Sequence, residues 1–352
     1  MFGLLLIVTS LYLRMKLQQA GVNSLVLKIF MAFTIISVIV YETAFFFKKF
    51  YPGRSGEILY AAIFTVIIIF LLASLSFGLV DLLTCFKKFT RSKIIIALAI
   101  TSIISIYGFC EAYFVRPVFI ELKTNKLPVD IKKIRLVYLT DVHLGGIYTR
   151  WHFDRVMNIV NEAKPDIFIL AGDIVDGDIS YREYELNLLR AAAENSKYGA
   201  FAVNGNHEYY HIFEEDVENI IREYGFDYLI DERRELQNLN MVVIGFDDKK
   251  FGWISPYLHE DDHKKFILVI KHRPGLPNDA ENNFDLQISG HTHNGQFWPL
   301  GYFKNLSSKS SQGLSYKSGG VVYVSSGAGF NGPAMRIFAR PEVTIIDLVN
   351  EQ

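Results

Sequence analysis

The feature that most constrains the fold of this chain is an uncharged run, residues 58–80, which is long enough to cross the hydrocarbon core of a bilayer as a helix. Residues 94–115 form a second such run, broken only by Glu111, and residues 29–47 form a third, broken by Glu42 near its end. Long runs almost free of charge are rare in globular domains. We therefore expect three helices that span a membrane.

Residues 1–13 are apolar but short for a span, and they lack the basic stretch and small-residue cleavage site of a secretory signal. We expect a fourth, short span there, with an interfacial segment as the alternative. The sequence thus predicts a transmembrane region over residues 1–116 with three to four helices.

Composition changes sharply at Arg116. Hydrophobic residues make up 50% of the chain, and nearly all of the excess lies before Arg116, whereas all nine histidines lie after it. Both cysteines, Cys85 and Cys110, lie in the apolar part, so the polar part has neither a disulfide framework nor a cysteine-based metal site. A net charge of −1 gives no indication of nucleic-acid binding.

Basic residues flank every loop between the expected spans, so the orientation rests on small differences. Six basic residues follow the last span, between Arg116 and Arg135, and the positive-inside rule then favours a cytoplasmic polar domain. The basic residues of segment 87–93 oppose this orientation. Oligomeric state cannot be inferred from the sequence.

Strand and helix patterns alternate in the polar part, and short strands then follow one another. Residues 117–132 are expected to be a linker that carries one strand, at 118–122. Helices are expected at 151–163, 181–193 and 213–224. Strands are expected at 134–139, 167–170, 200–203, 228–230, 234–236, 241–244, 266–270, 286–288, 321–324 and 343–348, and a loop at 306–319. This order predicts two packed sheets flanked by helices over residues 133–352.

Five segments of the polar part carry side chains that bind metals, each at or just beyond the end of a hydrophobic run. They are Asp141-Val142-His143, Gly172-Asp173, Gly205-Asn206-His207-Glu208, His272, and Gly290-His291-Thr292-His293. In an extended backbone both side chains of an Asp-X-His motif point the same way. One such motif is common by chance, but five together predict a two-metal phosphoesterase.

The order and spacing of these motifs resemble those of the calcineurin-like metallophosphoesterases, over residues 133–348. Segments 245–248 and 339–342, with Gly295-Gln296, are similar to the membrane-associated bacterial branch, which includes UDP-2,3-diacylglucosamine hydrolases. The fold that the resemblance implies is an α/β four-layer αββα double sandwich. It also implies an integral protein of a bacterial inner membrane, which fits the apolar runs.

The resemblance implies two divalent metal ions. Asp141, His143 and His293 are implied to hold one, and Asn206, His272 and His291 the other, with Asp173 as the bridge. Two divalent cations bring four positive charges, and the two carboxylates return two negative ones. The remaining positive charge suits an anionic phosphoryl group and an activated water. Mixed imidazole and oxygen ligands favour Mn, Fe or Zn, and among these we favour Mn.

The resemblance also implies that His207 protonates the leaving oxygen and is not a metal ligand, because Asn206 at a metal places the imidazole beside the phosphate. Asp176 and Glu208 are expected to orient histidines or order the turn. Arg273 and Arg336 are candidate substrate contacts, as is the loop 297–316. The glycines Gly172 and Gly290 are expected to let the backbone approach the metals closely.

For several of these residues the sequence leaves open a purely structural role instead of a role in metal binding or catalysis. Asp141 and His143 can cap a helix or turn, and His272 can be a satisfied core histidine. Asn206 can serve only in a left-handed turn, Asp176 can be an ordinary loop residue, and the loop 297–316 can be a solvated connection. His152, His211, His259 and His263 have no motif support, so surface or core roles are the default.

Departures from the family pattern narrow the expected substrate. Gly177 and Asn204 stand where the family's protein phosphatases have arginines, so the paired guanidinium clamp for a phosphomonoester is missing. Asn294 stands where glycine is common in the bacterial branch, and asparagine tolerates the left-handed conformation that the turn needs.

We expect hydrolysis of a phosphodiester or pyrophosphate bond in a lipid-linked substrate such as UDP-diacylglucosamine, at the bilayer. The alternative is a tethered phosphodiesterase for a soluble substrate such as a cyclic nucleotide. A membrane sensor or scaffold without catalysis is the third reading, and the complete ligand set opposes it.

Overall fold

The computed structural model describes ten stretches of the chain. They are residues 2–50, 54–145, 149–176, 179, 182–210, 214–249, 252–281, 283–298, 312–317 and 319–352.

Four helices come first, at the positions of the expected spans. They are α1 (Phe2–Gln19), α2 (Ser24–Phe50), α3 (Arg54–Leu83) and α4 (Arg91–Tyr113). Among the described residues, the segments Ile58–Leu83 and Arg91–Tyr113 are long and apolar enough to cross a membrane, and Ser24–Ser37 is a shorter apolar helix. The expectation of three to four spans is therefore met in part. The helix α1 carries Arg14 and Lys16, which lowers its apolar character.

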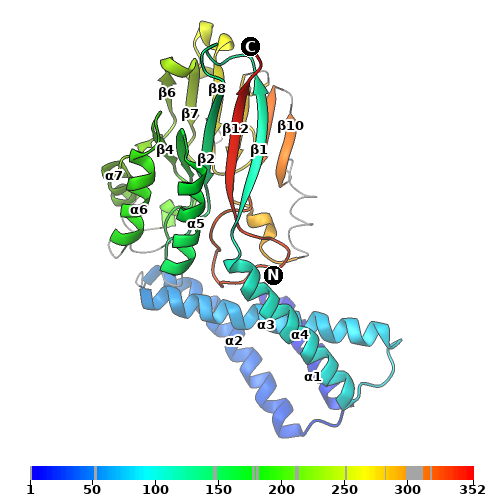
Figure 1. Ribbon diagram of the computed structural model, residues 1–352. Helices are drawn as coiled ribbons and strands as arrows, with labels where there is room; N and C mark the ends of the chain where they lie inside the picture. Colours follow the sequence, from blue (N-terminus) through cyan, green and yellow to red (C-terminus); the bar gives the residue numbers. More distant parts are fainter. Residues whose placement is uncertain are drawn as a thin grey trace.

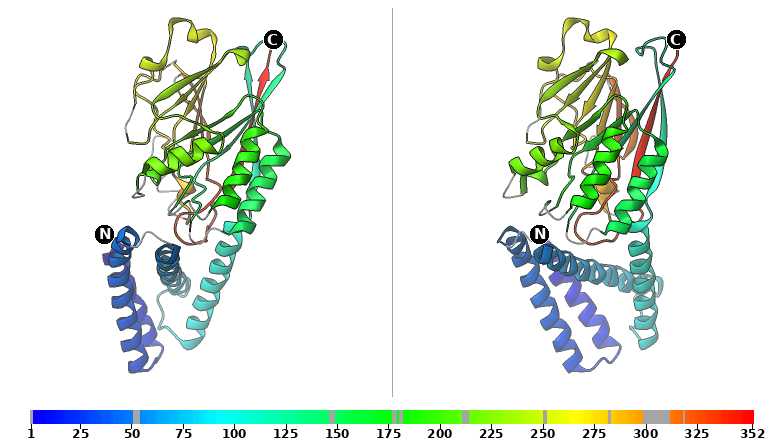
Figure 2. Two further views of the ribbon diagram at one scale, coloured as in Figure 1. Left: turned by 90° about the vertical axis from the view of Figure 1, so that its left-hand side faces the viewer. Right: turned by 60° about the vertical axis from the view of Figure 1, so that its left-hand side comes forward.

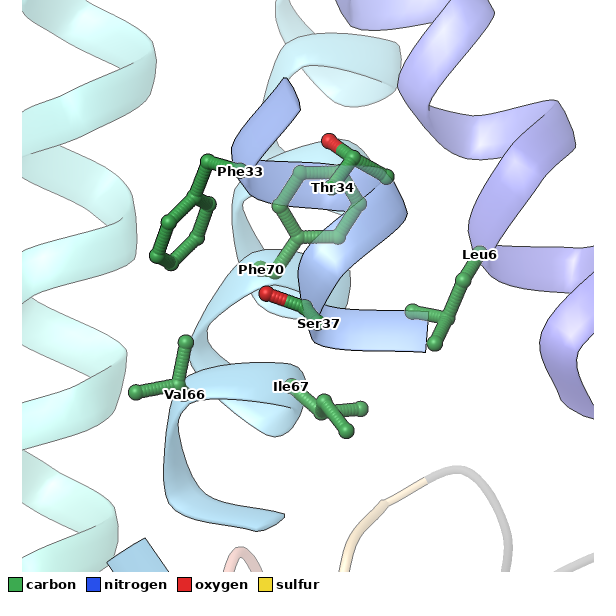
Figure 3. A pocket seen from close by; sticks show the side chains of 7 residues that line it. All are labelled: Leu6, Phe33, Thr34, Ser37, Val66, Ile67 and Phe70. Carbon is green, nitrogen blue, oxygen red and sulfur yellow. The ribbon is translucent and has the colours of Figure 1, made fainter. Parts of the chain in front are cut away.

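The helix α3 has a different orientation from its neighbours. It runs across the underside of the α/β domain, whereas α1, α2 and α4 extend away from the domain (Figures 1 and 2). A buried ion pair joins α1 to α3, with Lys16 Nζ 2.6 Å from Asp81 Oδ2. A small cavity of about 10 Å³ lies where α1, α2 and α3 meet. Figure 3 shows the side chains that line it, those of Leu6, Phe33, Thr34, Ser37, Val66, Ile67 and Phe70.

The helical region packs directly on the domain. Ile68 and Leu72 of α3 form one apolar cluster with Phe297, Met335 and Ile337 of the domain. On α4, a Cβ added at Gly108 would lie 2.7 Å from Met335 Cγ, so glycine permits this close contact. The two parts thus share a packed interface.

Two six-stranded mixed sheets form the domain. The first has the order β1-β12-β2-β3-β4-β5, and the second has the order β10-β11-β9-β8-β7-β6. The first sheet consists of β1 (Arg116–Thr124), β12 (Glu342–Asn350), β2 (Lys133–Leu139), β3 (Ile167–Ala171), β4 (Ala200–Val203) and β5 (Asp227–Tyr228). The second consists of β10 (Gly313–Lys317), β11 (Gly320–Val324), β9 (Leu286–Ser289), β8 (Phe266–Ile270), β7 (Met241–Gly245) and β6 (Glu232–Leu236).

Alternation along the strands divides the core into three layers. Leu136 of β2 and Leu268 of β8 point toward the opposite sheet and belong to the central layer between the two sheets. Val137 and the other alternate residues of the first sheet face α5 (Arg150–Ala163), α6 (Glu183–Glu194) and α7 (Glu214–Glu223). The three expected helices are therefore confirmed.

The outer face of the second sheet differs from the expected four-layer arrangement. Val242 and Val269 are covered by Ile254, Ala280 and Phe284, which lie in loops and short 3-10 turns. In the described part of the chain no α-helix packs on this face. The α/β class with two packed sheets is confirmed, but the second helical layer is not.

Two segments form edge strands of the sheets, although neither of them was assigned to a sheet from the sequence. The predicted linker strand is β1, an edge strand that pairs in parallel with β12 along its full length, from Arg116 opposite Glu342 to Thr124 opposite Asn350. The strand β10 falls in the predicted loop 306–319, of which residues 306–311 and 318 lie outside the described residues. Both strands lie on sheet edges and are only partly buried, with exposed and half-buried residues alternating along each.

Candidate metal centre

Loops after five strands meet at one end of the two sheets and carry the predicted ligands. Asp141 and His143 follow β2, Asp173 follows β3, and the 205–208 turn follows β4. His272 follows β8, and the 290–293 segment follows β9. Among the described residues, three groups have donor atoms within 4.8 Å of one another: Asp141, His143 and His293; His143, Asp173 and His207; and Asp173, His272 and His291.

Left-handed backbone is concentrated at this site. Asp141, His143 and Asp173 have φ values of 53°, 51° and 50°, and His291 and His293 have values of 69° and 49°. Such angles are uncommon for residues other than glycine, and they persist where surrounding contacts fix them. Asn294 also has a φ of 49°, as expected for the residue that replaces glycine in this turn.

The two predicted glycines do allow close approach. Gly172 has a φ of +82°, and a Cβ added there would lie 2.8 Å from His272 Cγ. A Cβ at Gly290 would lie 2.2 Å from Asp141 Oδ2. Any larger residue at these positions would displace a candidate ligand.

Asp173 is the centre of the constellation. Its Oδ2 lies 3.1 Å from His272 Nε2, 3.8 Å from His143 Nε2 and 3.9 Å from His207 Nε2. Burial raises its pKa, but the three imidazoles, His272 above all, hold the pKa of Asp173 well below its usual range. The carboxylate is therefore ionised and lies between both predicted metal sites.

His272 is oriented with one nitrogen toward Asp173. Its Nδ1 lies 2.9 Å from the carbonyl oxygen of Ala171, and because a carbonyl only accepts, Nδ1 carries the proton. Its Nε2 points into the site and lies 3.1 Å from Asp173 Oδ2. Burial lowers the pKa of His272, but the nearby carboxylate of Asp173 outweighs burial and raises that pKa to about 10. A cation at Nε2 would take the place of the proton there, which fits a metal ligand and opposes the core-histidine alternative.

Asp141 is also tightly held. The backbone N–H of His291 donates to both of its oxygens, at 3.1 and 2.9 Å, and Thr140 Oγ1 donates to Oδ2 at 2.8 Å. Its Oδ1 lies 3.1 Å from His293 Nε2. The Asn206 amide lines a pocket together with Asp173, His291 and His293. Carboxylates, imidazoles and an amide are a donor set that fits divalent Mn, Fe or Zn.

His207 has both ring nitrogens engaged. Its Nδ1 lies 2.5 Å from Asp176 Oδ1, and its Nε2 lies 3.2 Å from Asn331 Nδ2. Asp176 Oδ2 is also 3.2 Å from His143 Nδ1, so one carboxylate orients two histidines. This agrees with the expected orienting role of Asp176 and with a proton-transferring His207 between fixed partners.

Glu208 links the loop that follows β3 to the loop that follows β4. Its carboxylate accepts the backbone N–H groups of Asp173 at 3.0 Å, Ile174 at 2.7 Å and Gly205 at 2.6 Å. Burial, followed by the charge of Asp173, raises its pKa, and the backbone N–H groups oppose that rise. The side chain therefore fixes the loop that carries Asp173.

The two predicted arginine contacts have other partners. Arg336 is fully buried, and its guanidinium donates to the carbonyl oxygens of Ser326 and Ala339 at 2.8 Å and lies 3.1 Å from His293 Nδ1. It holds the loop behind a ligand and cannot reach a substrate, which corrects the prediction. Arg273 pairs with Asp248 at 3.1 Å and is not among the described residues that line the pocket.

The unassigned histidines have ordinary roles where they are described. His152 is buried with Nε2 2.9 Å from the Ala328 carbonyl, and its burial lowers its pKa to about 4. His259 precedes a 3-10 turn, and His263 Nδ1 lies 2.6 Å from the Glu260 carbonyl. His211 lies outside the described residues.

The site opens into a pocket of about 330 Å³. Of its lining, Phe297 belongs to the loop 297–316 named as a candidate substrate contact, and the residues contributed by α3 were not predicted. Asp173, Asn206, His207, His291 and His293 line one side. Tyr60 and Phe64 of α3 line the other side, with Phe297 and Asn331. Sequence patterns gave no signal for Tyr60 and Phe64, because two aromatic residues in an apolar helix look like lipid-facing or packing residues.

The fold and the donor cluster define a class: double-sheet hydrolase domains with two adjacent metal sites at the ends of the strands. The sequence profile of the calcineurin-like phosphoesterases matches residues 134–295. An uncharacterised metallophosphoesterase of Aquifex aeolicus is 32% identical over 259 residues, which cover 71% of this chain and 97% of the relative. The chain belongs to the calcineurin-like metallophosphoesterases and is a metal-dependent phosphoesterase.

Two further relatives are more distant or longer. A transmembrane protein with a metallophosphoesterase domain from Danio rerio is 31% identical over 72% of this chain, and the match spans 62% of that protein's length. A dimetal phosphatase structure from Danio rerio is similar over 56% of this chain and 88% of its own, with 14% identity and a TM-score of 0.36. The second likeness is too distant to support a statement on function.

Proposed function

We propose that this chain is a membrane-anchored, two-metal hydrolase that cleaves a phosphodiester or pyrophosphate bond in a lipid-linked substrate. The observation that supports it is the position of the site. The pocket that holds the Asp and His donors is closed on one side by α3, which contains a segment long and apolar enough to cross a membrane. A substrate at the phosphoryl position therefore lies next to an apolar helix.

The chain's own groups fit this chemistry. Divalent cations, when bound, offset phosphoryl charge and act as Lewis acids that activate water. Asp173 holds negative charge between the two donor groups, and His272 is fixed with its Nε2 toward them. His207 would protonate the leaving oxygen from Nε2: Asp176 holds Nδ1, and the leaving oxygen would take the place of the Asn331 amide nitrogen that Nε2 faces at 3.2 Å. We propose Mn as the native metal.

A diester or pyrophosphate suits the site better than a phosphomonoester. Asn204, where protein phosphatases have an arginine, accepts the Tyr228 hydroxyl at 2.6 Å and donates to Asp247 at 3.2 Å. Gly177, at the other position, lies outside the described residues. Among the described residues that line the pocket there is no arginine or lysine. A dianionic monoester would thus find no arginine or lysine partner among these described lining residues.

We place residues 1–116 in a bacterial inner membrane as three to four helices, with the domain in the cytoplasm. This proposal is supported by the two apolar candidate spans and by the transmembrane relative. Of lipid-linked phosphates, UDP-diacylglucosamine is the one we propose. Its pyrophosphate and its two acyl chains match a metal centre beside an apolar helix.

The test uses the purified full-length protein with Mn²⁺ and with chelator. UDP-diacylglucosamine, 3′,5′-cyclic AMP and bis-p-nitrophenyl phosphate are assayed side by side. We expect chelator-sensitive turnover of bis-p-nitrophenyl phosphate and a higher kcat/KM for the lipid-linked substrate. A higher kcat/KM for the cyclic nucleotide would replace our proposal with the soluble-substrate alternative. Absence of metal-dependent turnover on all three would reject it.

A further inference from the structure

The wall of the pocket that faces the metal ligands is aromatic. Tyr60 and Phe64 are four residues apart on α3, so they lie on the same face of the helix. Their rings are nearly parallel, with centroids 6.0 Å apart and an interplanar angle of 7°. Phe297, only 8% exposed, extends this wall from the domain. The pocket thus has an ionic side and an apolar side.

Close packing fixes these rings against the loop that carries Asn331. A Cβ added at Gly332 would lie 3.1 Å from Phe64 Cδ1 and 3.8 Å from Tyr60 Cε1. Gly332 has a φ of +74°, so the loop needs glycine both for its backbone and for the contact with α3. The preceding residue, Asn331, contacts His207. The position of α3 is therefore coupled to the catalytic histidine through two adjacent loop residues.

The flank of α3 beside the pocket is also apolar. Leu59, next to Tyr60, is 51% exposed, and α3 has no charged residue between residues 58 and 80. An alkyl chain attached near the scissile phosphate therefore meets no charged group in this part of α3. A planar base would not insert between two rings whose centroids are 6.0 Å apart.

We propose that Tyr60 and Phe64 form a subsite for the alkyl part of the substrate, so that α3 determines specificity and is more than an anchor. The inference rests on the proposed function, because it assumes that the adjacent centre hydrolyses a phosphodiester. It goes further in assigning chain recognition to two named residues of a helix outside the phosphoesterase domain. Apolar burial against the rings would raise the affinity for alkylated substrates.

The experiment compares p-nitrophenyl octyl phosphate with p-nitrophenyl methyl phosphate, using full-length protein in phosphatidylcholine nanodiscs with Mn²⁺. The measured quantity is the ratio of the two kcat/KM values. Partition of the octyl ester into the lipid is the same for every variant, so it cancels between variants. For the wild type we expect a ratio of about 10 or more in favour of the octyl ester.

Phe64→Leu and Phe64→Gln form a matched pair, because both remove the ring but only glutamine makes the wall polar. We expect Phe64→Leu to keep most of the preference and Phe64→Gln to lower the ratio about fivefold or more, mainly through KM of the octyl ester. Tyr60→Ala should lower the ratio in the same direction. Leu75→Ala, at a position of the same helix that is 59% exposed, should leave the ratio unchanged.

The outcomes separate this inference from the proposed function. If the wild type turns over neither ester, the hydrolase proposal fails and the subsite fails with it. If both esters are turned over but Phe64→Gln and Tyr60→Ala keep the wild-type ratio, only the subsite is wrong. If the same variants instead lose a preference for thymidine 5′-p-nitrophenyl phosphate, the wall binds a nucleobase and the alkyl assignment is overturned. If Phe64→Gln does not fold, the ratio measured for Tyr60→Ala decides whether the wall binds the alkyl chain.

Discussion

His207 can be assigned two different roles, metal ligand or proton donor, and a direct test distinguishes them. Its donor atom lies within 4.8 Å of donors of His143 and Asp173, so it could bind a metal, but its ring nitrogens contact Asp176 and Asn331. These two partners favour proton transfer over metal binding. The difference has a measurable consequence, because an acid matters most when the leaving group is a poor one.

We predict that His207→Asn keeps the full metal content and lowers kcat for methyl phenyl phosphate by about 10²–10³-fold. The loss should be much smaller for methyl p-nitrophenyl phosphate, whose leaving group needs no proton. Asp176→Asn should lower kcat in the same order of esters, because Asp176 positions the ring. Loss of one metal ion from His207→Asn, measured by elemental analysis, would make His207 a ligand.

At the scale of elements, the pairing of β12 with β2 is supported by a bidentate ion pair. Arg135 donates to Asp347 from Nε at 2.7 Å and from Nη2 at 2.8 Å, and Lys133 Nζ lies 3.2 Å away. The hydrogen bonds from Arg135, opposed by partial burial and assisted by Lys133, lower the pKa of Asp347. A carboxylate whose pKa is lower in the folded state stabilises the fold above its unfolded pKa and loses that contribution as the pH falls.

We predict that Asp347→Asn lowers the free energy of unfolding by about 1 kcal/mol at pH 7. The difference from wild type should shrink as the pH falls below about 4, where the carboxylate first becomes protonated in the unfolded state, and it should vanish once the pH is also below the lower pKa of the folded state. Thermal unfolding of both proteins between pH 7 and pH 3 measures it. Glu351→Gln removes a pair that is 3.4 Å long and more than half exposed, and it should have almost no effect. Equal midpoints for Asp347→Asn and wild type at pH 7 would contradict the prediction.

The strand β1 shows that the helical region and the domain are joined through a sheet. In β1, Ile120 packs against the core between the sheets, whereas its neighbour Phe119 is 66% exposed. We predict that Ile120→Asp destabilises the domain by about 1–3 kcal/mol and that Phe119→Asp has little effect. A thermal shift of equal size for both variants would mean that this segment is a linker without a fixed face.

Sequence patterns predicted the elements that carry strong periodicity. The helix α5 and the strands β2, β3 and β8 were predicted within about one or two residues, because buried β-branched runs and amphipathic spacing are local signals. The edge strand β10 was missed, because its surface is half exposed and its sequence is rich in Gly, Ser and Lys. The predicted extent of β1 was right in part, but its place in the sheet depends on pairing with β12, about 220 residues away.

The candidate ligands were predictable because metal binding restricts side-chain chemistry at the ends of strands. Asn331 was not, because an asparagine before glycine in a loop indicates only a turn. The substrate role predicted for Arg336 failed because charge alone does not tell whether a guanidinium is exposed or is held by backbone carbonyls.

At the scale of the whole molecule, the central feature is the contact between α3 and the metal-binding end of the domain. It depends on Gly332, Met335 and Ile337 packing against helices that precede them by more than 200 residues. No local pattern encodes such a contact. In Figures 1 and 2 the helix α3 runs beneath the α/β domain, so the apolar helices and the domain form one packed unit.

The account depends most on the cluster around Asp173 binding two cations that are needed for hydrolysis. Elemental analysis of the full-length protein, joined to its turnover of bis-p-nitrophenyl phosphate, tests this directly. We predict about two Mn, Fe or Zn ions per wild-type chain, and fewer than one with at least about 10³-fold lower turnover for Asp173→Asn. The control Asp261→Asn, at a side chain that is 80% exposed, should match the wild type. Full metal content and turnover in Asp173→Asn would contradict the account.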